Sequence, residues 1–422
     1  MSELNSMNRE IKKNQLRRQI VPTSANKDES SEEIIKKARV KVKKKRLRIF
    51  LVLSVVCLAG GIGVYQYFQF HQYTSFGVVW EKAMNEGSFE GYMNFGSNVL
   101  KYSKDGASYI DSKGKEVWIQ SYEMKSPKAY VSGDYAAIAD QQGNSIYIFD
   151  KAGNTGVATT VLPIVKASVS SYGVVAAILE DSTSNYIYFF KQDGSVLDVK
   201  IKALLGGDSG YPVDVSLSPD GTQLIGAYAY VKNGTLNGRV AFHNFAEIGK
   251  SVPDRLVGGF DEPYVSSLVA QVRFLDDTYS CAFADNSVSF YSTKNALSPE
   301  LIKQIPIEDE IKSVFYSKKY VGLVVTGSDG QERLQVYKAN GDKVFTSDFQ
   351  YSYTNADIDG DRVFLYNENS CRVYNLSGRL KFSGTFDFPV SKVRNGRFPN
   401  TLIVTGPQNM KEIRLQIGGH YQ

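Results

Sequence analysis

Histidine is scarce in this sequence, which holds only three in 422 residues: His71, His243 and His420. A zinc site is usually built from several Cys and His residues at ligand spacing, and a serine nucleophile needs a nearby His as its base. Residues 207–210 read Gly-Asp-Ser-Gly and resemble the nucleophile motif of chymotrypsin-like proteases, but Tyr211 replaces the Gly expected next. We interpret this segment as a loop. The sequence therefore predicts no catalytic residue, no metal site and no cofactor.

Cysteine is equally scarce, with three residues at Cys57, Cys281 and Cys371. Three are too few for a disulfide framework. Cys57 lies inside a long apolar run, so only the other two could pair. We expect buried free thiols, because the repeat described below places these two residues far apart.

The excess of positive charge is confined to the N-terminus. Residues 1–48 hold 15 Lys and Arg against 6 Asp and Glu, whereas the remainder holds 34 against 38. A slightly acidic domain lacks the basic surface that a phosphate backbone requires, so we expect no nucleic-acid partner. The basic tail is instead typical of a membrane-topology signal.

One long uncharged run follows the basic tail directly. Ile49–Phe68 contains 20 residues without a charge, and a helix of that length spans about 30 Å, the thickness of a bilayer core. By the positive-inside rule, the basic cluster ahead of it keeps the N-terminus in the cytoplasm. The alternative is a cleaved signal peptide, but its apolar region is usually only about 7–15 residues long and is followed by a small-residue cleavage site. No such site is clear here.

These features predict a single-pass membrane protein whose C-terminal domain lies outside the cell. Ser30 and Glu33 offer a capping box, so a helix is expected to begin there and to continue into the membrane. The predicted segments are residues 1–46, a basic and partly disordered cytoplasmic tail; 47–68, a transmembrane helix; 69–90, a juxtamembrane linker; and 91–422, an extracytoplasmic β-rich domain.

A repeat organises the β-rich domain. An alternating strand, a turn with Gly or Asn and a second strand recur about every 43 residues, around Asp111, Asp150, Lys191, Asn244, Ser292, Lys338, Asn375 and Arg414. Three or four short antiparallel strands in about 40–45 residues make one blade of a β-propeller. The predicted fold is therefore all-β, a β-propeller of seven or eight blades, with eight favoured. A β-sandwich is the alternative, but it would not give so regular a period.

The two ends of the repeat are incomplete, since the first unit lacks an inner strand and the last lacks an outer one. Propellers often close by combining strands from both chain ends in one blade, and we expect that closure here. Cys281 falls in the fifth unit and Cys371 in the seventh. Blades two apart do not bring Cα atoms within the roughly 7 Å that a disulfide requires.

Two further patterns bear on possible sites. Residues 357–361 read Asp-Ile-Asp-Gly-Asp, but the EF-hand spacing and its bidentate Glu are missing, so we expect a solvated turn before the next strand. Tyr228 and Tyr230 enter a long hairpin, residues 227–240, that should project beyond its blade. Because loops often carry recognition, this aromatic pair is the predicted binding site.

Three segments carry a resemblance to a known family: FGSNVLKYSKDGASYIDSKGKEVW at 95–118, YPVDVSLSPDG at 211–221 and VAFHNFAEIG at 240–249. With these in order, the chain resembles an uncharacterised family of single-pass, membrane-anchored β-propeller proteins of Gram-positive bacteria, described as a domain of unknown function. The resemblance covers nearly the whole chain after the tail. It implies topology and fold, and it supplies no activity or catalytic residue.

Two classes of function remain. The first is a non-enzymatic binding or scaffolding module that contacts a protein or a cell-wall polymer through loops of a propeller face. The second is an extracellular glycan or peptide hydrolase or lyase with carboxylates in the propeller channel. Carboxyl groups with a raised pKa clustered at one channel mouth would favour the enzyme, whereas an apolar or aromatic face would favour binding. The missing nucleophile and metal patterns favour the binding module.

Overall fold

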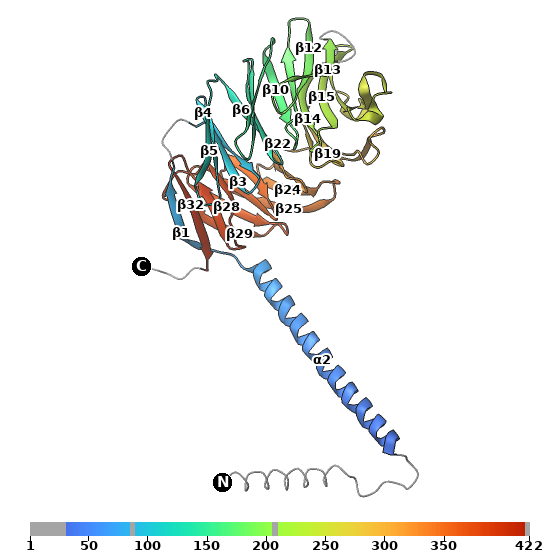
Figure 1. Ribbon diagram of the computed structural model, residues 1–422, viewed down its shortest axis with the longest axis vertical. Coiled ribbons are helices and arrows are strands. Elements are labelled where there is room, and N and C mark those ends of the chain that lie inside the picture. The colour runs from blue at the N-terminus through green and yellow to red at the C-terminus, as the bar shows by residue number, and fades with distance from the viewer. Residues whose placement is uncertain (1–30, 85–88, 205–209, 418–422) are drawn as a thin grey trace. The chain divides into compact units, whose positions relative to one another are not determined.

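The computed structural model describes residues 31–84, 89–204 and 210–417 (Figure 1). The chain divides into two compact units, Met1–His71 and Gln72–Gln422. The tail expected to be disordered, Ser30 of the capping box, His420 and residues 207–209 of the Gly-Asp-Ser-Gly motif lie outside the described residues.

The N-terminal unit contains one long helix, α2 (Ser31–Phe70). Its stretch Arg39–Tyr67 is long and apolar enough to cross a membrane. The most apolar 18-residue part of this stretch is not buried by the described residues. The predicted membrane segment, residues 47–68, lies within this helix. The basic residues that precede the apolar run therefore belong to the same helix.

The second unit is an eight-bladed β-propeller in the part of the chain that the structure describes (Figure 1). Each blade is a four-stranded antiparallel sheet. Blade 1 contains β2 (Gly91–Phe95), β3 (Asn98–Tyr102), β4 (Gly106–Ile110) and β5 (Glu116–Ser121). Blade 2 contains β6 (Pro127–Ser132), β7 (Tyr135–Asp140), β8 (Ser145–Asp150) and β9 (Thr155–Thr159). Blade 3 contains β10 (Ile164–Val169), β11 (Val175–Glu180), β12 (Ser184–Phe190) and β13 (Val196–Leu204).

Blades 4 to 7 repeat this order along the chain. Blade 4 contains β14 (Tyr211–Leu217), β15 (Gln223–Lys232), β16 (Thr235–Asn244) and β17 (Leu256–Phe260), with the short 3-10 helices η1 (Glu247–Gly249) and η2 (Pro253–Arg255) before β17. The short 3-10 helix η3 (Glu262–Tyr264) leads to blade 5, which contains β18 (Val269–Phe274), β19 (Tyr279–Ala284), β20 (Ser287–Ser292) and β21 (Glu300–Pro306). Blade 6 contains β22 (Glu310–Tyr316), β23 (Tyr320–Thr326), β24 (Glu332–Lys338) and β25 (Lys343–Phe349). Blade 7 contains β26 (Asn355–Asp359), β27 (Arg362–Tyr366), β28 (Ser370–Asn375) and β29 (Leu380–Thr385).

Blade 8 closes the ring with strands from both ends of the unit. Its order is β1 (Ser75–Ala83), β32 (Asn409–Gln416), β31 (Thr401–Thr405) and β30 (Lys392–Asn395). The antiparallel register of β1 and β32 runs from Ser75 opposite Gln416 to Ala83 opposite Asn409. The indole of Trp80 adds a side-chain bond, donating from Nε1 to Glu412 Oε2 at 2.7 Å. This pairing confirms the expected closure and the favoured count of eight blades.

Two details of the sequence prediction are corrected. Residues 69–90 are not simply a linker, because Ser75–Ala83 is the outer strand of blade 8. The first unit does not lack an inner strand, since β2 lies beside β3 in a complete blade 1. Only the last unit is incomplete, and β1 completes it.

The repeated turn that sets the period is a side-chain-capped hairpin. In blade 1, Asp111 Oδ1 accepts hydrogen bonds from the backbone N–H groups of Lys113 and Lys115, both at 2.8 Å. Gly114 between them has φ +75°, a conformation that costs little only for glycine. Asp150 in blade 2 and Asn375 in blade 7 cap the equivalent turns in the same way.

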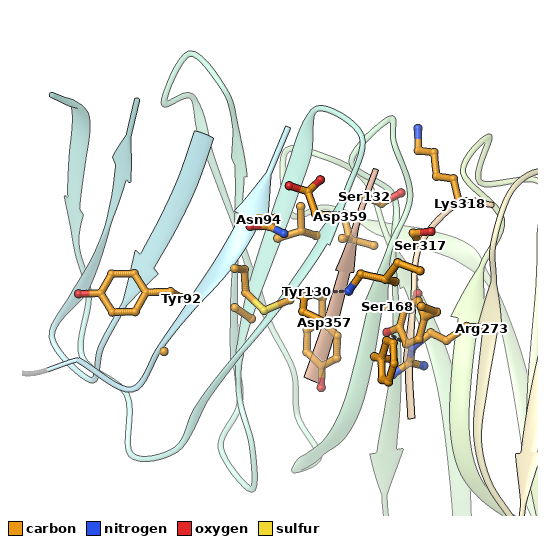
Figure 2. Close-up of a pocket in the computed structure, with 18 of the residues that line it drawn as sticks. Tyr92, Asn94, Tyr130, Ser132, Ser168, Arg273, Ser317, Lys318, Asp357 and Asp359 are labelled. Carbon is orange, nitrogen blue, oxygen red and sulfur yellow. Dashed lines mark hydrogen bonds between the residues drawn. The ribbon is translucent and has the colours of Figure 1, made fainter. Parts of the chain in front are cut away.

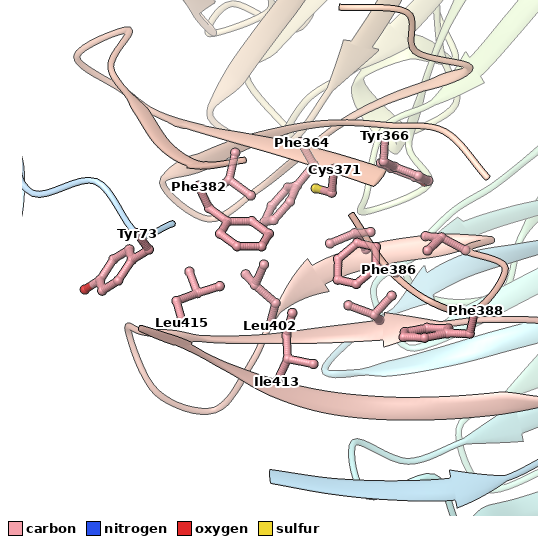
Figure 3. Close-up of a cluster of buried hydrophobic side chains, with 14 residues drawn as sticks. Tyr73, Phe364, Tyr366, Cys371, Phe382, Phe386, Phe388, Leu402, Ile413 and Leu415 are labelled. Atoms are coloured by element: carbon pink, nitrogen blue, oxygen red, sulfur yellow. The ribbon is translucent and has the colours of Figure 1, made fainter. Parts of the chain in front are cut away.

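The core consists of apolar side chains packed between neighbouring blades. Figure 3 shows the cluster where blade 7 meets blade 8, with Phe364 and Phe382 on one side and Leu402 and Leu415 on the other. Tyr73, just ahead of β1, joins it. Burying one such side chain contributes roughly 1.5–3 kcal/mol, so each blade is held mainly by its neighbours. Cys281 lies in blade 5 and Cys371 in blade 7, and both are buried free thiols as expected.

His243 on β16 predicts a dependence of stability on pH. It is 5% exposed, its Nδ1 has no hydrogen-bond partner within the described part of the chain, and burial lowers its pKa to about 4. In the unfolded chain His243 therefore becomes protonated below about pH 6.5, whereas in the folded chain it becomes protonated only below about pH 4. Stability falls as the pH drops through this window, by about 3 kcal/mol from this residue. Urea unfolding at pH 7 and pH 4.5 should show a smaller loss for His243→Leu than for the wild type. Equal losses would contradict the assignment.

Candidate functional site: the central channel

The innermost strands of the eight blades (β30 in blade 8, and the first strand of each other blade) surround a cavity of about 1160 Å³ along the propeller axis (Figure 2). Every blade contributes at least one side chain to its wall: Asn94, Tyr130, Ser168, Ser216, Arg273, Tyr316, Asp357 and Lys392. The wall therefore mixes hydroxyl, amide, aromatic and charged groups. This cavity is the candidate functional site.

Polar side chains join the innermost strands of neighbouring blades. These strands belong to separate sheets and are not paired through their backbones. In each case a Ser or Asp oxygen accepts a hydrogen bond from a backbone N–H of the next blade. The four contacts are Ser168 with Leu217 at 3.0 Å, Asp214 with Val272 at 2.9 Å, Ser216 with Phe274 at 3.0 Å and Asp359 with Asn395 at 3.0 Å. These bonds fix the positions of the strands that line the channel.

Asp214 on β14 is the centre of a buried charge network. Its side chain is 1% exposed, and Oδ2 accepts a hydrogen bond from Arg273 Nη1 at 2.8 Å, while Lys166 Nζ lies 3.5 Å from Oδ1. Arg273 also donates from Nε to the hydroxyl of Tyr316 at 2.6 Å. Burial alone would lower the pKa of Arg273, but Tyr316 and Asp214 together raise it. The network holds the guanidinium charged and rigid at the channel wall.

A second ion pair joins Asp357 on β26 to Lys392 on β30. Burial lowers the pKa of Lys392, but the neighbouring Tyr366 and Asp357 outweigh it, and the net shift is upward. Burial also raises the pKa of Tyr366 to about 12. The lysine therefore stays charged, and its charge is balanced by that of Asp357 within the channel wall.

This geometry corrects the interpretation of residues 357–361 as a solvated turn. Asp357 and Asp359 belong to β26 and line the channel, where each is bound by a neighbouring blade. Gly360, with φ +60°, and Asp361 make the turn before β27. The predicted turn began three residues too early, because acidic residues are unusual in a strand.

Tyr228, the first predicted binding residue, is not presented by a loop. It lies within β15, is 4% exposed and packs in the core between blades 3 and 4. Burial raises the pKa of its hydroxyl above the usual range. A ring enclosed in this way offers no surface to a partner, so the expectation that it forms an exposed pair is wrong.

Tyr230, the second predicted residue, is half-buried farther along the same strand. Arg239 stacks over its ring at 4.9 Å, and Nη2 of that arginine bonds Asp261 Oδ2 at 2.9 Å. Beyond this stack the hairpin exposes two apolar residues that pair directly across the strands, Val231 at 71% and Leu236 at 48%. The exposed end of the hairpin therefore carries an aliphatic pair, Val231 and Leu236, directly behind the polar turn 232–235, rather than an aromatic pair.

The comparisons with known proteins agree on the fold. Residues 69–415 match the family described as "Family of unknown function (DUF5711)". The solved Dos1 propeller is 11% identical, with a TM-score of 0.51 over 81% of this chain and 96% of that one. The WD40 domain of Pan2 from Neurospora crassa is 10% identical, with a TM-score of 0.40 over 70% and 90%. Apo AztD from Citrobacter koseri is 10% identical, with a TM-score of 0.48 over 71% and 87%.

The match to the Dos1 propeller, at 11% identity, shows a shared fold and nothing about activity. No functionally curated protein matches the sequence. The family match begins just before the propeller, at residue 69, and extends into its last strand, β32. The chain therefore belongs to the DUF5711 family of unknown function.

Proposed function

We propose that the protein is a membrane-anchored binding module that holds an extracytoplasmic propeller close to the membrane and recruits a protein partner there. In this proposal α2 is the single membrane span, the basic tail is cytoplasmic and the propeller lies on the outer side of a bacterial cell envelope. The observation that carries the binding role is the exposed aliphatic pair Val231 and Leu236, which lies directly behind the polar turn of the β15–β16 hairpin.

The hairpin has the composition of a protein contact surface. Val231 and Leu236 are cross-strand partners, and Val265, which follows η3, is 63% exposed. Backbone N–H of Ser266 bonds Asn237 Oδ1 at 3.0 Å, which ties the segment carrying Val265 to the hairpin. Exposed aliphatic side chains on a rigid support favour a protein partner over a polar wall polymer.

The arrangement of charge in the channel supports a role without catalysis. Asp214 and Asp357 are both paired with cations. Each of these ion pairs engages its carboxylate with a cation inside the wall, so neither carboxylate is presented free to a substrate. Confinement to a membrane also raises the effective concentration of a tethered binder, so a modest intrinsic affinity is sufficient.

A single cysteine placed near the end of the hairpin tests the membrane orientation of the propeller and the contact with a partner in one experiment. The native Cys281 and Cys371 are buried, so Val231→Cys adds an accessible thiol to the propeller. Treated on intact protoplasts with a membrane-impermeant, thiol-reactive crosslinker, this variant is expected to react and to capture a protein partner. The matched control is Val117→Cys on β5, an equally aliphatic site that is 50% exposed. It should react to the same extent and capture nothing specific.

The two readouts separate the two parts of the proposal. If neither variant reacts until the membrane is lysed, the orientation is wrong. If both react and yield the same products, the hairpin is not the contact surface. If the protein hydrolyses a glycan or a peptide, and changing one channel carboxylate abolishes that activity, then the protein is an enzyme and not a binding module.

A further inference from the structure

We propose that the central channel is itself a binding site, separate from the hairpin, for a neutral, polyhydroxylated ligand of the size of an oligosaccharide. The cavity of about 1160 Å³ exceeds the roughly 300–1,000 Å³ typical of pockets for small molecules. It is lined by all eight blades, so the ligand would lie along the axis of a rigid ring.

The balance of charge points to an uncharged ligand. The charged side chains of the wall are four acids and four bases: Glu90, Asp134, Asp357, Asp359, Lys151, Arg273, Lys318 and Lys392. Asp134 pairs with Lys151, Asp357 with Lys392, and Arg273 with the adjacent Asp214. With no excess of either sign, the channel offers no net attraction to an anion or a cation.

The remaining polar groups suit hydroxyl partners. Ser132, Ser317 and Ser391 contribute hydroxyls, and Asn94, Asn355 and Gln271 contribute amides. Each of these groups both donates and accepts, as a sugar hydroxyl does.

Tyr316 provides an aromatic surface for the ligand. It is 37% exposed while lining the cavity, and the guanidinium of Arg273 lies 5.5 Å from the centre of its ring. The hydroxyl of Tyr316 accepts the bond from Arg273 Nε, so the ring is fixed before any ligand arrives. An ordered, half-exposed ring among hydroxyls and amides resembles the mixed surface that a sugar ring, apolar on its faces and polar at its edges, requires.

Titration calorimetry on the full chain in detergent tests the proposal. The probes are tetramers of N-acetylglucosamine, of β-1,4-linked glucose and of galacturonic acid, together with trialanine. We expect binding of at least one neutral tetramer, weakened about tenfold or more by Tyr316→Leu, which removes the ring. Tyr316→Phe keeps the ring and should lose less. Tyr186→Leu on β12, a half-buried tyrosine away from the channel, should bind as the wild type does.

Each other outcome contradicts the proposal. Binding of neither neutral tetramer would contradict a neutral, polyhydroxylated ligand. Tighter binding of the galacturonate would assign an anionic ligand, and tighter binding of trialanine would assign a peptide. Unchanged affinity in a folded Tyr316→Leu variant would place any sugar site outside the channel. Loss of the hairpin contact leaves these measurements unaffected, so the two proposals fail independently.

Discussion

Deletion of residues 409–422, which removes β32, is expected to prevent the propeller from folding as a closed ring. The strand pairs with β31 on one side and β1 on the other, and it buries Met410, Ile413 and Leu415 almost completely. Burial of three such side chains contributes about 5–9 kcal/mol, before any backbone pairing is counted. That is comparable with the whole stability of a typical protein, roughly 5–15 kcal/mol. Thermal unfolding followed by circular dichroism should show no cooperative transition in the shortened chain.

Deletion of residues 418–422 alone is the matched control. It shortens the same end but leaves every pair between β1 and β32 in place. We expect the melting temperature of this variant to stay close to that of the wild type. A cooperative transition in the chain that lacks β32 would show that seven blades are self-sufficient and that the closure contributes little.

Replacement of Asp214 by alanine is expected to destabilise the protein by roughly 3–5 kcal/mol. The change leaves Arg273 without its buried counter-ion and removes the acceptor for the backbone N–H of Val272. Asp134→Ala is the control, because Asp134 pairs with Lys151 while its side chain is 72% exposed. Exposed pairs contribute only about 0–1 kcal/mol. Urea unfolding of both variants measures the difference.

A second substitution shows whether the loss comes from charge. In the double variant Asp214→Leu with Arg273→Met, two apolar groups replace the pair, so much of the stability should return. If Asp214→Ala costs no more than Asp134→Ala, the network is not the structural centre of the channel wall. If the double variant is as unstable as the single one, the backbone bond to Val272 matters more than the charge.

The sequence alone predicts the ring because the information for each blade is local. Turns such as the one capped by Asp111 recur at a nearly constant spacing, and that period predicts the blade and narrows the number of blades to seven or eight. The strand β1 is harder to recognise. Ser75–Ala83 alternates like a strand, but its partner lies more than 300 residues away, so nothing nearby marks it as part of a blade.

The candidate site depends on information that is not local. Asp214 and Arg273 stand in separate blades, and each looks like an isolated polar residue in an apolar strand. Packing of blade 4 against blade 5 brings them to 2.8 Å. The placement of Tyr228 failed for a related reason. Strand periodicity shows which residues share a face, but not how far a hairpin extends beyond the neighbouring blades.

The pairing of β1 with β32 also links the fold to the order in which the chain is made. Trp80 and Glu412, which bond across this pair, are 332 positions apart in sequence. A ribosome completes β1 before any blade exists and β32 after all the others, so the first strand must wait, unpaired, for the last. During that interval β1 exposes an open strand edge, the feature that proteases and aggregating chains exploit. A chain that lacks β32 leaves this edge of β1 unpaired. The ring is therefore closed, and the edge protected, only in chains that include β32.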